Sequence, residues 1–402
     1  MTFGYRGPRA HYVRIASIDE KREPAELFSN LCEKRLLYSK LIAAVTAAAP
    51  ALIVIDARFG SESCPKKDKG TEALIRSVRE ALENEVPVVI GIDSDTKEEL
   101  RRRDQSGQIP LRDGELLSTG GLDFGPSSPD LIFGHVRLNA DVRKIPLYWP
   151  TYFSLSEAES HQHPKPLPGL SFAATRLYDN LLEEQPRLTW AIKRGVHPYS
   201  SFIEERQFPT YEALDLICGA PNVPANRDWE NCVPGEYGRP ALRGHVVVIG
   251  ERTESEFRDS VVGSVPGYIL QANYIESLLD DRYFPAVRTW VQILLSLALF
   301  ALIEAVFTLQ ADFPERALGL AVCIVVGAWT VSWLVLLVGG FYVVAWLPGL
   351  LAIIGKYADC KFEGKEKSNV PKADSNQNVA LHAHLYVEPP ESEEPVVSRR
   401  PG

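Results

Sequence analysis

The sequence predicts an α/β domain with a mixed, largely parallel sheet and flanking helices, followed by an all-α transmembrane segment of three helices. Two observations predict the domain: short, wholly apolar runs alternate with amphipathic stretches, and Gly- or Pro-containing turns separate them. A third observation predicts the membrane segment, because the apolar residues of this 402-residue chain concentrate in residues 290–357. The predicted regions are an α/β domain at 10–285, transmembrane helices at 289–358 and a polar tail at 359–402, expected to be disordered and cytoplasmic.

The first 93 residues supply strands and helices in alternation. Strands are expected at 12–19, 51–56 and 86–93, and helices at 34–50 and 71–85. In the second helix, Leu74, Val78 and Leu82 share one face while the charged residues lie opposite. Strands that are apolar throughout and joined by helices indicate a parallel sheet covered on both faces, with right-handed crossovers.

The rest of the domain is less regular. Loops are expected at 94–130 and 198–242, a hairpin at 130–149 with its turn near Asn139–Asp141, helices at 170–184 and 267–281, and a late strand at 245–249. The hairpin rests on alternation alone, which is a weaker signal than a two-residue turn motif.

The apolar region predicts spans at 290–309, 317–338 and 341–357. A buried core hairpin is the alternative, but soluble domains rarely contain runs this apolar. Lysines after the third span favour a cytoplasmic C-terminus, which places the large domain outside the cytoplasm in a multi-pass protein of the cell (inner) membrane. The N-terminal residues contain no apolar signal, so either translation starts upstream or the first internal span directs translocation. Glu304 within the first span marks either a functional contact or an interfacial position.

Charge and cysteine content narrow the partners. A net charge of −9 without a basic stripe excludes a nucleic-acid partner. Cys32, Cys64, Cys218 and Cys232 lie in the large domain, and an oxidising compartment would allow two disulfides. Cys218 and Cys232 are the candidate pair because they flank one loop, although unrelated free thiols are the open alternative. Zinc is not expected, because no CxxC pair exists.

Three predicted strands end in aspartate, namely Asp19, Asp56 and Asp93, and Asp259 follows the late strand. The carboxyl ends of parallel strands form the ligand-binding edge of open α/β sheets. These four residues are therefore the candidate ligand-binding residues, suited to Mg²⁺, Ca²⁺ or acid–base work. The alternative is that each aspartate only caps a turn.

Other chemistry is not predicted. The stretch "HVVVIGERTESEFRDS" at 245–260 has a strand and a single glycine, but carboxylates follow where a phosphate cradle has several glycines. The "HQH" and "HAH" histidine pairs lack further ligands at metal spacing, and no G-x-S-x-G nucleophile elbow is present. No catalytic residue and no cofactor is expected.

The order of these segments resembles the CHASE domain of class two, the extracytoplasmic sensory module of bacterial membrane cyclases and histidine kinases. The likeness is carried by "RIASID" at 14–19, "RLLYSKLIAAVTAAAPALIVIDARF" at 35–59, "LIFGHVRLNADVRKIPLYW" at 131–149 and "LRGHVVVIGERTESEFRDSVVGSVPGYILQANYIESLLDDRYF" at 242–284. In this family the strand–glycine stretch closes the sensory domain, and membrane spans follow. The sequence departs from the family in lacking an N-terminal span and a catalytic output domain after the last span, and in having "EKREP" at 20–24.

The resemblance implies a membrane-anchored extracytoplasmic sensory protein that is not itself an enzyme. It would bind an unknown small-molecule ligand, act through a signalling effector protein and form a homodimer. Two alternatives stay open: a metal-dependent hydrolase that uses the aspartate edge, and a structural membrane protein whose output domain was lost.

Overall fold

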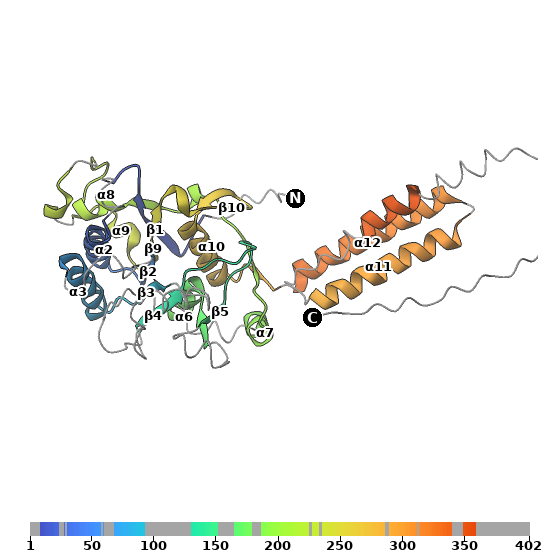
Figure 1. The fold of residues 1–402 in the computed structure, drawn as a ribbon, viewed down its shortest axis with the longest axis horizontal. Helices are drawn as coiled ribbons and strands as arrows, with labels where there is room; N and C mark the ends of the chain where they lie inside the picture. The colour runs from blue at the N-terminus through green and yellow to red at the C-terminus, as the bar shows by residue number, and fades with distance from the viewer. Residues whose placement is uncertain are drawn as a thin grey trace, which may run out of the picture.

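The computed structural model describes residues 9–23, 28, 30–57, 59, 68–92, 130–151, 165–178, 186–224, 227–232, 235–285, 289–311, 313–339 and 349–358. The predicted loop at 94–129 and the polar tail at 359–402 lie outside these residues. An α/β domain is followed by apolar helices (Figure 1).

A six-stranded sheet forms the centre of the domain. Its strands run in the order β4-β3-β2-β9-β1-β8, and every neighbouring pair is parallel. Their bounds are β1 Val13–Asp19, β2 Leu52–Asp56, β3 Val88–Ile92, β4 Leu131–His135, β8 Thr210–Glu212 and β9 Val246–Arg252. The largely parallel sheet with flanking helices is confirmed, although among the described residues this sheet is parallel throughout and not mixed. The late strand β9 lies in its interior, between β1 and β2.

Helices cover both faces of the sheet, as the apolar strands predict. On one face α2 (Leu31–Thr46), α3 (Lys69–Glu83) and α8 (Ala213–Cys218) pack against Ile53 and Ile55 of β2. On the other, α6 (Leu170–Tyr178), α7 (Pro186–Arg194) and α10 (Gly267–Leu279) pack with Leu52 and Val54. This alternation follows from the period of two along a strand. Val246 to Ile249 of β9 are completely buried, and each such side chain stabilises the fold by about 1.5–3 kcal/mol.

The remaining elements are short. They are β5 Tyr148–Thr151, β6 Lys165–Pro168, β7 Tyr199–Ser200, α9 Arg239–Leu242, β10 Phe257–Ser260, β11 Gly263–Pro266, β12 Tyr283–Phe284 and the 3₁₀ turns η2 Glu205–Gln207, η3 Trp229–Asn231 and η4 Glu254–Glu256. Three two-stranded sheets pair β5 with β6, β7 with β12, and β10 with β11. Several of these lie in 198–242, where the sequence predicted loop.

The predicted hairpin at 130–149 is wrong. β4 pairs in parallel with β3 over all five of its residues, and β5 pairs antiparallel with β6. The apolar run Leu131–His135 instead extends the parallel sheet beyond β3, as the last strand on that side. The segment between β4 and β5 is therefore free to turn across the end of the sheet, where Asn139 donates a hydrogen bond to the Lys144 carbonyl oxygen (2.9 Å).

Two helices follow the domain. α11 (Thr289–Leu309) and α12 (Pro314–Gly339) contain the two stretches in the described part of the chain that are long and apolar enough to cross a membrane, Trp290–Leu309 and Pro314–Val335. The third predicted span overlaps a shorter apolar helix, Gly349–Ala358, while residues 340–348 lie outside the description. Leu299, Ile303 and Phe307 of α11 pack against Ala317 and Ala321 of α12.

Candidate functional site

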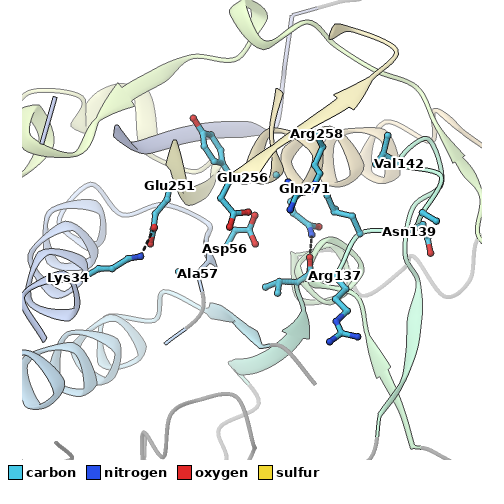
Figure 2. Close-up of a pocket in the computed structure, with 15 residues that line it drawn as sticks. Lys34, Asp56, Ala57, Arg137, Asn139, Val142, Glu251, Glu256, Arg258 and Gln271 are labelled. Atoms are coloured by element: carbon cyan, nitrogen blue, oxygen red, sulfur yellow. Dashed lines mark hydrogen bonds and ion pairs between the residues drawn. The ribbon is translucent and has the colours of Figure 1, made fainter. Parts of the chain in front are cut away.

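A cavity of about 440 Å³ lies at the carboxyl edge of the sheet (Figure 2). Parallel strands end together at this edge, which is where open α/β sheets place their ligands. The lining comes from five parts of the chain: α2, the end of β2, the segment after β4, the end of β9 with the turn that follows it, and the start of α10. The lining residues are Lys34, Asp56, Ala57, Val136, Arg137, Leu138, Asn139, Ala140, Val142, Glu251, Glu256, Arg258, Gly267, Tyr268 and Gln271. The volume falls in the range of small-molecule sites.

The strand register brings the first acidic side chains together. Asp56, the last residue of β2, pairs with Gly250 of β9, so Glu251 follows beside it. Glu251 accepts hydrogen bonds from Lys34 Nζ (2.5 Å) and from the hydroxyl of Tyr38 (2.8 Å). Burial raises the pKa of Tyr38 well above its usual value, and the nearby Glu251, Asp56 and Glu256 raise it further. Tyr38 therefore stays a neutral donor to Glu251.

Gly250 serves packing. A Cβ added to it would lie 2.7 Å from Cδ1 of Tyr268 and closer still to Cβ and Cγ of that ring. The glycine lets α10 approach β9, and the Tyr268 hydroxyl then lies 3.0 Å from Ser17 Oγ of β1. The strand–glycine stretch thus positions α10 beside the cavity, consistent with the prediction that it is not a phosphate cradle.

Gln271 connects α10 to the segment after β4. Its Nε2 donates to the Val136 carbonyl oxygen (3.2 Å), and its side chain is completely buried. Its Oε1 has no hydrogen-bond partner among the described residues. A buried acceptor without a donor is costly, so the cavity wall contains an open hydrogen-bonding position.

The structure separates the four predicted aspartates. Asp56 lines the cavity, whereas Asp19 ends β1 without lining it and accepts a hydrogen bond from the Lys21 backbone N–H (2.9 Å). Asp259 is exposed on β10, where it pairs with Ser264. Asp93 lies outside the described residues. Within the described ranges, no three His, Cys, Asp or Glu side chains are arranged to hold a metal ion.

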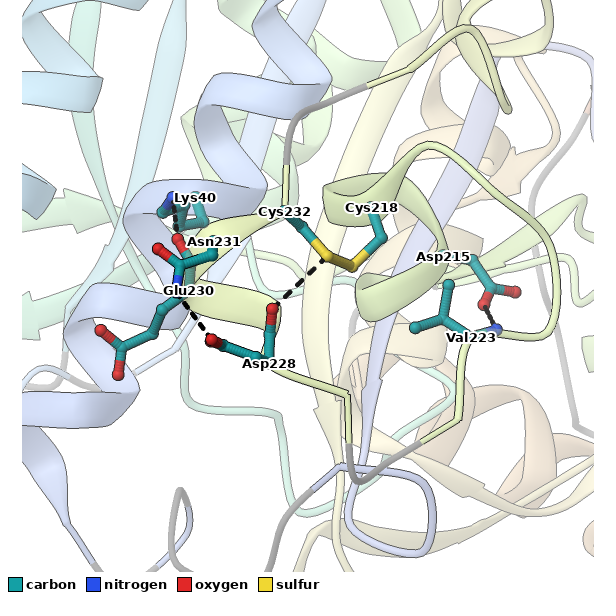
Figure 3. The surroundings of a disulfide bond; sticks show 8 residues. All are labelled: Lys40, Asp215, Cys218, Val223, Asp228, Glu230, Asn231 and Cys232. Atoms are coloured by element: carbon teal, nitrogen blue, oxygen red, sulfur yellow. Dashed lines mark hydrogen bonds between the residues drawn. A yellow bond between two sulfur atoms is a disulfide. The ribbon is translucent and has the colours of Figure 1, made fainter.

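The candidate cysteines form a disulfide in the structure, with the two Cα atoms 4.8 Å apart (Figure 3). Cys218 ends α8, and Cys232 follows η3. Within the loop, the Asp215 carboxylate accepts a hydrogen bond from the Val223 backbone N–H (2.7 Å), and Lys40 of α2 donates to the Glu230 carbonyl oxygen (2.7 Å). Cys32 is also disulfide-bonded. Disulfides persist in oxidising compartments, so both are consistent with an extracytoplasmic domain.

Comparison with known families identifies the chain. The CHASE2 domain family matches residues 2–306, which is more than half of the sequence. The chain belongs to the CHASE2 domain family. This confirms the resemblance drawn from the sequence and is consistent with a sensory role, since CHASE2 domains are extracytoplasmic sensory domains. No curated protein and no solved structure matches the chain.

The sequence alone does not predict most of the residues that line the cavity of this CHASE2 domain. The carboxylates that follow Gly250, Glu251 and Glu256 among them, argue only against phosphate, and no sequence pattern marks Lys34 or Gln271. The alternation of strands and helices points to the carboxyl edge, but no local spacing links residue 34 to residue 271. One signal was available: a charged residue directly after a strand–glycine end, as in "VVVIGER", places its side chain at that edge.

A second acidic group lies beyond β1. Glu23 is buried, and neither of its carboxylate oxygens has a hydrogen-bond partner among the described residues. Burial raises the pKa of Glu23 to about 8, and the neighbouring Glu212 carboxylate adds to the shift. Glu23 is consequently protonated at neutral pH. Glu23 does not line the cavity. Its buried carboxyl group bears on the stability of the domain.

Proposed function

We propose that this CHASE2 protein is a membrane-anchored extracytoplasmic sensor that binds a small ligand in the cavity and signals through a partner protein. The family match carries the proposal, because it covers the whole α/β domain and continues into α11. The cavity supports ligand binding by its place at the carboxyl edge. A separate effector is the expected recipient of the signal, and a second copy of the chain the expected immediate partner.

The surface of the helices supports membrane anchoring. Only 17% and 11% of the apolar windows of α11 and α12 are buried, and large apolar side chains such as Leu297 and Val331 are more than half exposed. A helix of a soluble core would bury these residues. An exposed apolar surface of this extent matches the hydrocarbon of a bilayer.

The one acidic residue within α11 has a basic partner. Glu304 forms an ion pair with Lys356 of the third apolar helix (2.7 Å). Charged groups in a membrane segment are stabilised by such pairing. This pair favours the helix-contact interpretation of Glu304 and supports an assembly of α11 with the Gly349–Ala358 helix.

Cysteine labelling in intact cells tests the orientation. The native Cys32, Cys218 and Cys232 are disulfide-bonded, so a new thiol is needed. Val261 is half exposed beside the β10–β11 turn. Val261→Cys in a background of Cys32→Ser, Cys64→Ser, Cys323→Ser and Cys360→Ser leaves one cysteine outside the Cys218–Cys232 disulfide. We expect a membrane-impermeant maleimide to modify the Val261→Cys thiol in cells whose outer envelope has been permeabilised and whose inner membrane is intact.

The matched control retains only native Cys360 in the polar tail. It is expected to react only after lysis, because the tail is predicted to lie in the cytoplasm. Reaction of Val261→Cys only after lysis would place the domain in the cytoplasm and contradict the proposal.

A further inference from the structure

We propose that the cavity binds a small organic cation, an aliphatic primary amine whose ammonium group lies between Asp56, Glu256 and Gln271. The inference rests on the proposed sensory function and adds the chemical class of the ligand. It follows from asking which groups in the cavity wall already have partners and which do not.

The basic groups of the cavity are already engaged. Lys34 pairs with Glu251, and the Arg258 guanidinium donates to the carbonyl oxygens of Ser255 and Phe257, both at 2.8 Å. Arg137, the third basic residue of the lining, also has an interaction within the protein. An anionic ligand would therefore compete with partners that these cations already have.

The open positions are acceptors. The Glu256 carboxylate accepts no hydrogen bond from any described side chain or backbone group, and the fully buried Gln271 Oε1 also lacks a donor. Asp56 adds a further negative charge at the same wall (Figure 2). Glu256 and Asp56 lie side by side in Figure 2, with Glu251 near them. A ligand that presents several N–H donors and a positive charge satisfies this wall.

The N-terminus of α10 does not reverse this preference. Helix N-termini attract anions, and no side chain caps this one. A Cβ at Gly267 would lie 3.6 Å from Glu256 Oε2, so the carboxylate of Glu256 is already beside the helix end. The position that an anionic ligand would take is occupied by an anion of the chain itself.

The opposite wall comes from the segment after β4 and offers apolar surface for a short hydrocarbon chain. It includes the aliphatic side chains of Val136, Leu138, Ala140 and Val142, beside the polar residues Arg137 and Asn139. An ammonium held by the acidic wall would direct the carbon chain of the amine toward these residues. The amphipathic form of an alkylamine therefore matches both walls.

Calorimetric titration of the full-length protein in lipid nanodiscs tests the ligand class. The probes are three molecules with a four-carbon chain and one polar end: butylamine, butanol and butyrate. We expect saturable binding of butylamine only. Glu256→Gln should weaken that binding about tenfold or more, because it removes a charge-assisted hydrogen bond.

Asp259→Asn is the matched control, since Asp259 is an exposed acid close to Glu256 in sequence but does not line the cavity. It should leave the affinity unchanged. Asp56→Asn is the second cavity variant, and thermal melting checks that each variant is folded. Failure of butylamine to bind, equal binding of butanol, or unchanged affinity in both cavity variants would overturn the amine proposal. Butyrate binding that the cavity variants abolish would overturn it while leaving the sensory function intact, which the labelling experiment tests separately.

Discussion

Removal of the Cys218–Cys232 disulfide should destabilise the domain by a predictable amount. The bond joins residues 14 positions apart and so closes a loop of about 15 residues. In the chain-entropy account, a cross-link of this length stabilises the fold by about 3 kcal/mol at 25 °C, because it restricts the unfolded chain. For a domain of this size, 1 kcal/mol corresponds to roughly 2–4 °C in melting temperature, so the expected loss is about 6–12 °C.

The test compares the parent with the double variant Cys218→Ala, Cys232→Ala by differential scanning fluorimetry of the full-length protein under oxidising conditions. The loop keeps its other ties in the variant, including the Asp215–Val223 and Lys40–Glu230 hydrogen bonds (Figure 3). The loss should therefore come from the cross-link and leave the fold intact. A melting temperature within about 2 °C of the parent would refute the entropic reasoning.

Reductant provides the control. It should lower the melting temperature of the parent by at least as much as the double substitution does. Any further decrease that reductant causes in the double variant reports the second disulfide, the one formed by Cys32. Protein made in a reducing cytosol should behave like the reduced parent, since disulfides do not persist there.

Three further predictions concern packing, protonation and the apolar helices. Gly250→Ala forces Tyr268 away from β9 and should lower the free energy of unfolding in urea by about 2–4 kcal/mol, because of overpacking and a weakened contact with Ser17. The control Gly267→Ala, whose Cβ meets only ordinary contacts, should cost far less. Similar losses in the two variants would contradict the close approach of α10 to β9. In the folded protein the pKa of Glu23 is raised from 4.5 to about 8, so its contribution to stability is full below pH 4.5 and is lost as pH rises through 8. Glu23→Gln should remove that part of the pH dependence of stability. An unchanged pH profile in this variant would argue against a buried, protonated Glu23. Glu304→Gln should lower the stability of the helical segment by about 1 kcal/mol, because it removes the ion pair with Lys356. The double exchange Glu304→Lys with Lys356→Glu should recover part of that stability. Equal melting temperatures of these variants in detergent would contradict the ion pair.

The fold was predictable where a single segment carries its own signal. The runs "ALIVID" and "VPVVIGID" are apolar at every position, and both became strands covered on two faces. The amphipathic helix predicted at 71–85 lies at Lys69–Glu83 for the same reason. Strand order was not predictable in this way. β9 lies between β1 and β2 in the sheet although it follows β2 by nearly 200 residues in the chain, and no local sequence pattern predicts that pairing.

The site was predictable only in outline. The carboxyl edge of the sheet is the correct region, and Asp56 is a correct member of the cavity wall. Asp259 was expected beside it because it follows β9, but the residues after β9 turn through η4 into the β10–β11 hairpin, which exposes Asp259 and places Glu256 in the cavity instead. The three-residue turn η4 determines which acidic side chain faces the cavity. The spacing of a residue from the end of the strand does not predict that turn.

The helix α10 is the element through which the proposed ligand would act on the membrane helices. Its first turn lines the cavity, and its last turns are tied to distant parts of the domain. The Glu276 carboxylate accepts hydrogen bonds from the backbone N–H groups of Tyr12 (3.1 Å) and Val13 (3.0 Å) at the start of β1, and Asn273 Oδ1 accepts one from the Ile203 N–H (2.6 Å).

These ties make a local bend within α10 costly, because each buried group would lose a partner. A ligand that binds two arrangements of the domain differently would therefore shift α10 as one body together with the start of β1. The chain leaves α10 through β12, whose pairing with β7 holds it to the domain up to Phe284, and α11 begins at Thr289. In this proposal the cavity and the membrane segment are joined by one stiff helix and only a few residues of connecting chain, so a small displacement at the acidic wall has a short path to the bilayer.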